Sequence, residues 1–222
     1  MGWDLHFLCA VAATEAAPLL CAGVTTFNAL RKAGLEAGAL VAVQGVGGLG
    51  HLGIQFARNM GFKTVAIGLG PETAALALEL GAHVYIDSLT EDAGAKLQEM
   101  GGANAILATA PSGKAMSGLV PGLGIRGKLL VVGLTPDPIQ VDSFALVSGT
   151  RSLSGSLTGT PIEEWETLEF SKMAGVKPMI EIMPLELAAE AYSRMMSAKA
   201  RFRIVLVTDA LEESRRVDAE LS

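Results

Sequence analysis

The chain has 222 residues, of which 50% are hydrophobic and 18% are charged, and its net charge is −6. This length and composition are enough for a sizeable core, in one domain or in one and a half. The acidic balance and the lack of a long run of Lys or Arg argue against nucleic acids and anionic membranes as partners. The mean hydropathy is +0.42, but no stretch approaches the ~18 consecutive apolar residues of a membrane span.

Residues 5–13 form a short apolar run that could imitate a signal peptide. Signal peptides carry positive charge before such a run, whereas this chain has Asp4 there. The two cysteines, Cys9 and Cys21, form neither a disulfide framework nor a C-x-x-C pair. A reducing compartment is the default for such a chain, so we expect a cytoplasmic protein.

Strand-like and helix-like patterns alternate from residue 40 onward, which favours a parallel sheet covered by helices on both faces. Strands are expected at residues 41–44, 63–67, 83–86, 105–108, 127–133 and 152–156. Helices are expected between them, at residues 49–60, 72–80, 93–100 and 112–120. The sixth strand is more polar than the others, as is typical of a sheet edge. The pattern predicts an α/β fold with a Rossmann-type, doubly wound parallel sheet of about six strands.

The pattern changes after Gly159, where helices are expected at residues 162–173 and 186–196 and strands at 179–182 and 202–207. We interpret residues 159–208 as a return segment that docks on another part of the protein. Its methionines are expected to fill a core: Met173, Met179, Met183, Met195 and Met196.

The expected domain organisation follows from this division. Residues 15–158 are the predicted dinucleotide-binding domain with its lead-in helix, and residues 1–14 fit neither a domain nor a linker. Residues 209–222 are a charged tail, either a frayed helix or disordered.

A glycine cluster at residues 45–50 follows the first predicted strand and precedes a predicted helix. In this G-x-G-x-x-G context, Gly45 makes a tight turn, Gly47 lets the backbone approach a pyrophosphate, and Gly50 lets helix and strand pack closely. The helix N-terminus adds free N–H groups and a partial positive charge. The cluster predicts dinucleotide binding, with a methyltransferase site or a purely structural turn as the alternatives.

The choice between NAD and NADP stays open at this stage. An Asp or Glu at the end of the second strand would bind the adenosine 2′-hydroxyl of NAD, and an Arg would indicate NADP. The chain has Gly68, Leu69 and Gly70 there. Glu72 lies at about the right distance, but a Glu in a first helical turn more often complements the helix dipole.

Five separated stretches, residues 16–26, 43–51, 106–111, 126–129 and 199–203, resemble the zinc-containing medium-chain alcohol dehydrogenases. The similarity runs from about Glu15 to Val207 in the family's order. It implies reversible hydride transfer between an alcohol or aldehyde and NAD or NADP, with zinc as a Lewis acid. In that family a preceding catalytic domain supplies a Cys and a His as zinc ligands and usually a four-cysteine structural lobe, none of which is in this sequence.

The resemblance implies a role for ten residues. Cys21 falls on the third catalytic zinc ligand, Thr25 beside the nicotinamide, and Gly68 at the ribose-recognising strand end. Gly133 falls on the strand end flanking the nicotinamide half, and Arg203 on an arginine that reaches the pyrophosphate. The pyrophosphate loop comprises Gly45, Gly47, Gly48, Leu49 and Gly50. Close relatives often carry Ser-Arg where this chain has Gly68 and Leu69, a departure that weakens an NADP assignment.

Plainer interpretations stand beside these roles. Cys21 could pack in a core, and one cysteine cannot form a catalytic zinc site, which needs about three protein ligands. His6 and Cys9 could join Cys21 only with a spacing that matches no zinc pattern. His51 could approach the cofactor, but a partly exposed structural histidine is the favoured interpretation.

Two main hypotheses follow. The first is an alcohol dehydrogenase whose chain is truncated to the cofactor-binding part, acting on a small-molecule alcohol or aldehyde. The second is a catalytically inactive module that binds NAD(P) and dimerises, with the edge strand near Leu153 as a homodimer contact. A zinc-free reductase is a third interpretation, against which Cys21 argues.

Overall fold

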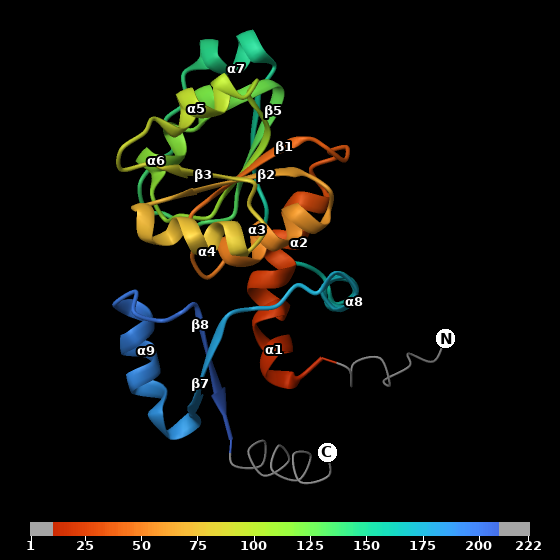
Figure 1. Ribbon diagram of the computed structural model, residues 1–222, viewed down its shortest axis with the longest axis vertical. Coiled ribbons are helices and arrows are strands. Elements are labelled where there is room, and N and C mark those ends of the chain that lie inside the picture. The colour runs from red at the N-terminus through yellow and green to blue at the C-terminus, as the bar shows by residue number, and fades with distance from the viewer. Residues whose placement is uncertain (1–10, 209–222) are drawn as a thin grey trace.

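The computed structural model describes residues 11–208, which form a six-stranded parallel sheet and a smaller two-stranded unit. In Figure 1 the six-stranded sheet lies in the upper part of the molecule and the smaller unit below it. The predicted charged tail, His6 and Cys9 lie outside the described residues. No helix in the described part of the chain is long and apolar enough to cross a membrane.

The predicted doubly wound sheet is confirmed. Its order is β3-β2-β1-β4-β5-β6, and every pairing is parallel. The strands are β1 Leu40–Gln44, β2 Lys63–Gly68, β3 Val84–Asp87, β4 Ala103–Ala108, β5 Leu123–Val131 and β6 Ser152–Gly155. The chain reverses its direction of winding between β1 and β4, and in such sheets ligands bind beyond the carboxyl ends of the strands at this point.

Side chains of the strands alternate between two cores, one on each face of the sheet. Val41 and Val43 of β1 point into the core that holds α2 (Val24–Arg31) and α3 (Gly50–Asn59). Leu40 and Ala42 point into the opposite core, which holds α5 (Ala93–Glu99) and α6 (Gly113–Ser117). All five residues of β1 are buried, as expected for a central strand covered on both faces.

Several helices differ from the prediction. The expected helix at 72–80 is a 3-10 turn, η3 (Pro71–Thr73), followed by α4 (Ala74–Glu79). The expected helix at 112–120 is α6 followed by a second 3-10 turn, η4 (Val120–Gly122). A proline stands at the start of each 3-10 turn, where its missing N–H and fixed φ interrupt the regular helix. The helix α7 (Ser143–Gly149) was not predicted. It exposes Phe144 and Val147, while Leu146 packs against the core.

The lead-in helix changes its winding around Cys21. It consists of α1 (Ala13–Pro18), a π-helical turn η2 (Leu19–Gly23), and α2. Pro18 lies inside this continuous helix and has no N–H for the ladder. Single π-helical turns inside α-helices are frequent at functional sites.

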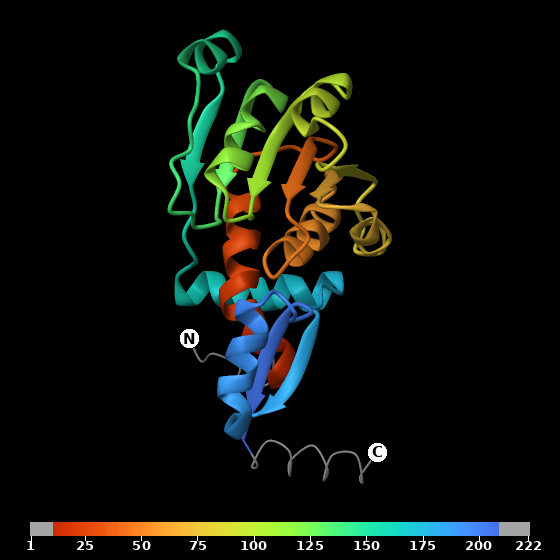
Figure 2. The same ribbon diagram turned by 90° about the vertical axis from the view of Figure 1, so that its left-hand side faces the viewer.

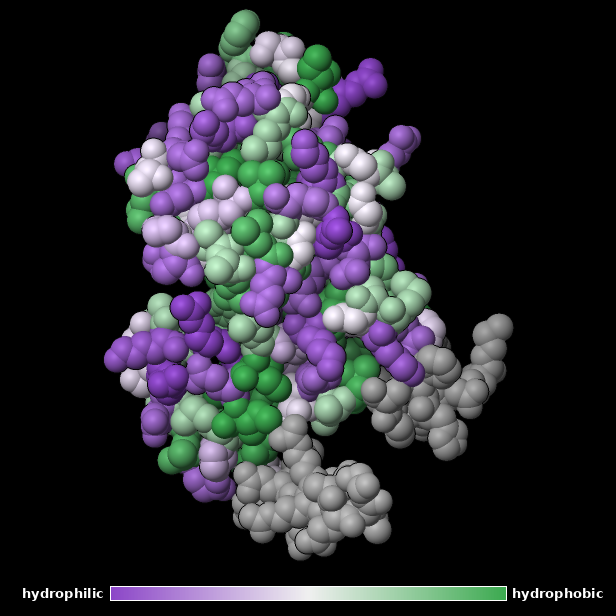
Figure 3. Space-filling model, viewed as in Figure 1, coloured by the Kyte–Doolittle hydropathy of each residue, from purple (hydrophilic) through white to green (hydrophobic). Residues whose placement is uncertain are grey.

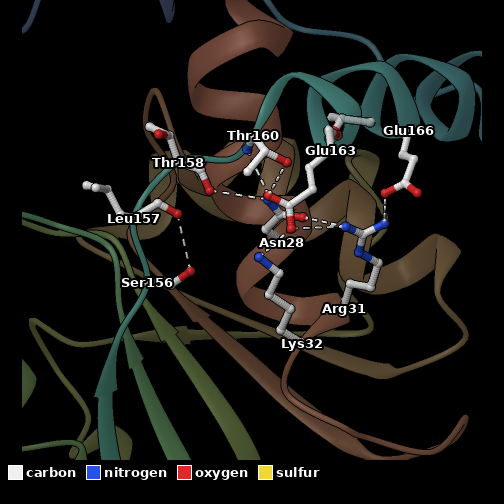
Figure 4. A network of polar contacts seen from close by, with 10 residues as sticks. Asn28, Arg31, Lys32, Ser156, Leu157, Thr158, Thr160, Glu163 and Glu166 are labelled. Carbon is white, nitrogen blue, oxygen red and sulfur yellow. Dashed lines mark hydrogen bonds and ion pairs between the residues drawn. The ribbon is translucent and has the colours of Figure 1, made fainter.

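The return segment starts with α8 (Pro161–Ala174), which packs against α2 and η2. Thr160 and Glu163 form a capping box at its start. Glu163 Oε1 lies 2.5 Å from Lys32 Nζ, and Arg31 pairs with Glu166 (Figure 4). Hydrogen bonds from Lys32 and from the Thr160 backbone lower the pKa of Glu163 to about 2.

The rest of the return segment forms a separate small sheet. Its strands β7 (Ile180–Pro184) and β8 (Arg203–Val207) pair in parallel and are joined by η5 (Leu185–Leu187) and α9 (Ala188–Met196). Both strands contact α1. Figure 2 shows the strands of the large sheet pointing toward this β7–β8 unit, with α8 running between them.

Candidate dinucleotide-binding site

The turn between β1 and α3 has a backbone that only glycine fits at two positions. Gly45 has a φ of +93°, and a Cβ added there would lie 2.8 Å from Thr109 Oγ1. A Cβ added to Gly50 would collide with the Gly45 carbonyl, whose carbon would be 2.7 Å away. The backbone at the start of α3 therefore lies directly against the backbone at the end of β1, as the glycine spacing predicts.

The middle of the turn is open. A Cβ added to Gly47 would have no atom within 4 Å, so nothing in the described chain occupies the space above this residue. Among residues 11–208, no backbone carbonyl accepts the N–H of Gly48 or Leu49. Free N–H groups at the start of a ten-residue helix, next to open space, form a cradle that fits a phosphate group.

Arg203 reaches this turn from the return segment. Its Nε donates to the Gly48 carbonyl oxygen at 3.2 Å, although 155 positions separate the two residues. Burial lowers the pKa of Arg203, and the electrostatic interaction with Cys21 opposes this shift. A guanidinium stays protonated at neutral pH in proteins, so Arg203 places a partly buried positive charge beside the turn.

His51 is a buried structural residue, and the expectation that it is partly exposed was wrong. Its Nδ1 lies 2.8 Å from the Gly47 carbonyl oxygen, and its Nε2 accepts the Met179 N–H at 3.1 Å. These partners require the neutral tautomer with the proton on Nδ1. Burial, helped by the charge of Arg203, lowers the pKa of His51 to about 4 against the opposing carbonyls of Gly47 and Gly48.

Cys21 lies in η2 and is exposed, so the alternative that it packs in a core is wrong. It is close enough to Arg203 for the two side chains to interact electrostatically. Thr25, one turn further along in α2, is buried. Within residues 11–208, no group of three or more His, Cys, Asp and Glu side chains could hold a metal ion. The described residues alone therefore do not fit a catalytic zinc.

The remaining predicted residues lie at two strand ends. Gly68 ends β2 next to the glycine turn, because the Gly45 N–H donates to Ile67 O at 2.8 Å. Gly133 lies two residues beyond β5, where its N–H donates to Ala108 O at 3.0 Å. A Cβ added to Gly133 would lie 2.6 Å from Thr109 O, so the chain after β5 approaches the chain after β4 closely.

Three residues around the turn were missed by sequence reasoning. Thr109 donates from Oγ1 to Gln44 O at 2.6 Å and closes the carboxyl ends of β1 and β4. Gln55 of α3 exchanges two hydrogen bonds with the Lys177 backbone. Tyr85 of β3 donates to Gly70 O at 2.6 Å. Only Thr109 lies in a stretch that suggested a family, and the other two depend on contacts between distant segments.

Fold and turn together define an α/β domain of the dinucleotide-binding class. Residues 48–174 match the sequence model of a family described as zinc-binding dehydrogenase. The chain belongs to this zinc-binding dehydrogenase family.

Individual relatives are similar over most of this chain. It is 42% identical over 205 residues to alcohol dehydrogenase notN of Aspergillus sp. (strain MF297-2), with 92% of this chain and 60% of that protein covered. An alcohol dehydrogenase of Geobacillus stearothermophilus is 37% identical over 196 residues, with 88% and 58% covered. The chain thus spans about 60% of the length of these relatives.

Solved structures give the same comparison. A cinnamyl alcohol dehydrogenase of Sorghum bicolor superposes with a TM-score of 0.79 and 29% identity, over 87% of this chain and 55% of that one. The alcohol dehydrogenase of Aeropyrum pernix gives the same TM-score and identity, over 87% and 57%. The predicted family and fold are confirmed.

Proposed function

We propose that the protein containing this chain is an oxidoreductase that transfers hydride between a small-molecule alcohol or aldehyde and NAD(P). The observation that carries the proposal is the open cradle at Gly47, with the free N–H groups of Gly48 and Leu49 and the cation of Arg203 around it. Relatives whose names are alcohol dehydrogenases support the substrate class. When bound, the nicotinamide ring would supply the site that accepts or donates hydride.

The chain's own residues bind and orient in this proposal. The N–H groups of Gly48 and Leu49 donate to the pyrophosphate, and Arg203 balances its negative charge. Gly45 and Gly50 hold the turn in shape, while Thr25 and Gly133 border the nicotinamide half. Because the pyrophosphate lies between the two nucleosides, its position determines where the ring and the adenosine lie.

Cys21 is proposed as one zinc ligand of the whole protein. Cys21 is exposed in a π-helical turn near the cradle, so it could bind a zinc ion together with ligands from elsewhere in the protein. A catalytic zinc needs about three protein ligands, and residues 11–208 contain no group of three His, Cys, Asp or Glu side chains that could hold it. The other ligands would come from a part of the protein not described here.

The second candidate is a module that binds NAD(P), dimerises and performs no chemistry. The lack of a complete metal site among residues 11–208 favours it. All four residues of the edge strand β6 are exposed, and Leu153 is 42% exposed there. An uncovered edge strand can pair with its copy in a second subunit. Sedimentation of the purified chain as a monomer would contradict this dimer.

Nucleotide binding is tested by Gly47→Ala. Because an added Cβ there meets nothing, the thermal midpoint should not change, but the methyl group would occupy the place of the pyrophosphate. We expect isothermal titration calorimetry to show NADH affinity falling at least about tenfold, a loss of roughly 1.4 kcal/mol. Gly118→Ala is the matched control, since its Cβ makes only ordinary contacts, at 3.6 Å or more, away from the turn.

Two outcomes would contradict the proposal. The wild-type chain could bind neither NADH nor NADPH at millimolar concentration, or Gly47→Ala could bind as well as Gly118→Ala. Measuring alcohol oxidation by the whole protein, with zinc added, then distinguishes the enzyme from the inactive module. Activity requires the whole protein, whereas nucleotide binding requires only this chain.

A further inference from the structure

We propose that Glu72, one turn beyond the end of β2, selects NAD(H) over NADP(H), because Tyr85 fills the space in which the usual strand-end side chain would lie. This inference rests on the proposed function, because it concerns the same nucleotide. The strand-end acidic residue that usually makes this selection is replaced here by Gly68.

The segment that follows β2 lies where the adenosine ribose is recognised in doubly wound sheets. β2 is the direct neighbour of β1, with Gln44 paired to Ile67 in register. The Gly45 N–H donates to Ile67 O, which connects the phosphate turn to the last residues of β2. A nucleotide whose pyrophosphate lies on Gly47 therefore has its adenosine ribose next to Gly68.

Tyr85 occupies the space that a side chain on Gly68 would need. A Cβ added to Gly68 would lie 2.5 Å from Tyr85 Oη and 2.9 Å from Thr73 Oγ1. The tyrosine cannot easily move away, because it donates to Gly70 O at 2.6 Å and contacts Thr73 Oγ1 at 2.5 Å. The glycine at this strand end is therefore a consequence of a tyrosine reaching across from β3.

Glu72 could supply the carboxylate that the strand end lacks, because its side chain lies over Gly70. Its Oε1 would lie 2.5 Å from a Cβ added to Gly70, so the carboxylate folds back over this segment. In the described part of the chain, no hydrogen bond or ion pair engages Glu72, whereas Asp87 Oδ1 already accepts the Gly70 N–H. Glu72 is exposed and free to accept a ribose hydroxyl.

The charge around the segment disfavours a 2′-phosphate. Residues 68–90 contain Glu and Asp but no Lys or Arg. A phosphate monoester carries a charge of about −2 at neutral pH and binds where cations surround it. At this strand end it would meet the Glu72 carboxylate without a Lys or Arg from residues 68–90 to compensate it, while an unphosphorylated ribose could donate its hydroxyl to Glu72.

The test measures binding of NADH and NADPH to the full chain by calorimetry, without any turnover. We expect NADH to bind at least about tenfold more tightly than NADPH. Glu72→Gln removes the negative charge with little change in shape and should narrow this ratio several-fold. Leu69→Arg, at a position that is 63% exposed, should raise NADPH affinity about tenfold by adding a cation beside the 2′-phosphate.

Glu79→Gln is the matched control, since Glu79 is an exposed carboxylate at the far end of α4. It should leave both affinities and their ratio unchanged. Equal affinity for the two nucleotides, tighter binding of NADPH, or the same ratio in Glu72→Gln as in the control would each overturn this inference alone. Binding of neither nucleotide would instead overturn the proposed function.

Discussion

The two sheets of this chain are held together in different ways. Every residue of β1 is buried between two cores, whereas none of β7 and only Val207 of β8 is buried. The connecting helix α9 leaves Tyr192, Met195 and Met196 at least 49% exposed, and Figure 3 shows apolar side chains gathered on the visible face of the β7–β8 unit. The large sheet makes its own core, while the small one depends on its attachment to the rest of the protein.

Besides the contacts of β7 and β8 with α1, three sets of hydrogen bonds attach the small sheet at or near the phosphate turn. His51 accepts from Met179, Gln55 exchanges two bonds with Lys177, and Arg203 donates to Gly48. All three connect α3 or the turn before it to the return segment. The same few residues therefore position the β7–β8 unit and shape the proposed pyrophosphate site, so damage on either side of this junction should affect both.

The largest effect is expected within the large sheet, from Gly50→Ala. The new Cβ would collide with the backbone of Gly45, which no change of rotamer can relieve. We expect a loss of more than about 3 kcal/mol in the free energy of unfolding, measured with urea, because β1 and α3 must separate. Gly155→Ala in β6 is the control, since its Cβ would meet nothing within 4 Å. Equal stability of the two variants would show that the turn is not tightly packed.

Sequence reasoning worked best inside the large sheet. Apolar runs such as 105–108 indicate buried strands, and the glycine spacing at 45–50 indicates a tight turn. Both signals are local, so the doubly wound parallel sheet and its phosphate turn could be predicted from neighbouring residues alone. The charge on Arg203 was placed at the turn only through a family resemblance, because a contact across 155 positions leaves no local pattern.

The errors concentrate where distant segments meet or where a surface is left uncovered. His51 looked partly exposed because its partner, Met179, is 128 positions away. The prediction that the methionines fill a core was wrong for Met173, Met195 and Met196, which are 49–77% exposed. From the sequence, Gly68 stands where a ribose-binding acidic residue is expected, and only the structure shows that Tyr85 fills the space of that side chain. In each case the deciding fact was what lies opposite a residue, which its own neighbours in sequence do not specify.

A second effect should appear at the junction as the pH falls. His51 has a pKa of about 4 in the fold and about 6.5 when exposed, so the unfolded chain binds its proton first. Its contribution to stability is therefore complete above about pH 6.5 and is lost as the pH falls toward 4. Between pH 7 and 4 this loss should reach about 3 kcal/mol, because protonated Nε2 can no longer accept the Met179 N–H.

The comparison variant is His51→Gln, which does not titrate in this range. Its free energy of unfolding should be lower than that of the wild type at pH 7. The difference between the two proteins should disappear by pH 4, because protonation of the carboxylates affects both alike. Parallel pH profiles for the two proteins would show that the histidine is not buried against Met179.

The smallest of these effects, and the most local, is expected from Gln55→Ala. This change removes both hydrogen bonds to Lys177, at 2.9 and 3.0 Å, and should weaken the attachment of the return segment by about 1–2 kcal/mol. Amide hydrogen exchange should rise in β7 and β8 while β1 and β4 stay protected. Gln98→Ala is the matched control, because Gln98 also donates to two carbonyls, those of Pro121 and Leu123, but within the large sheet domain. If the two variants raised exchange in the same regions, the β7–β8 unit would unfold together with the large sheet and the distinction between the two units would fail.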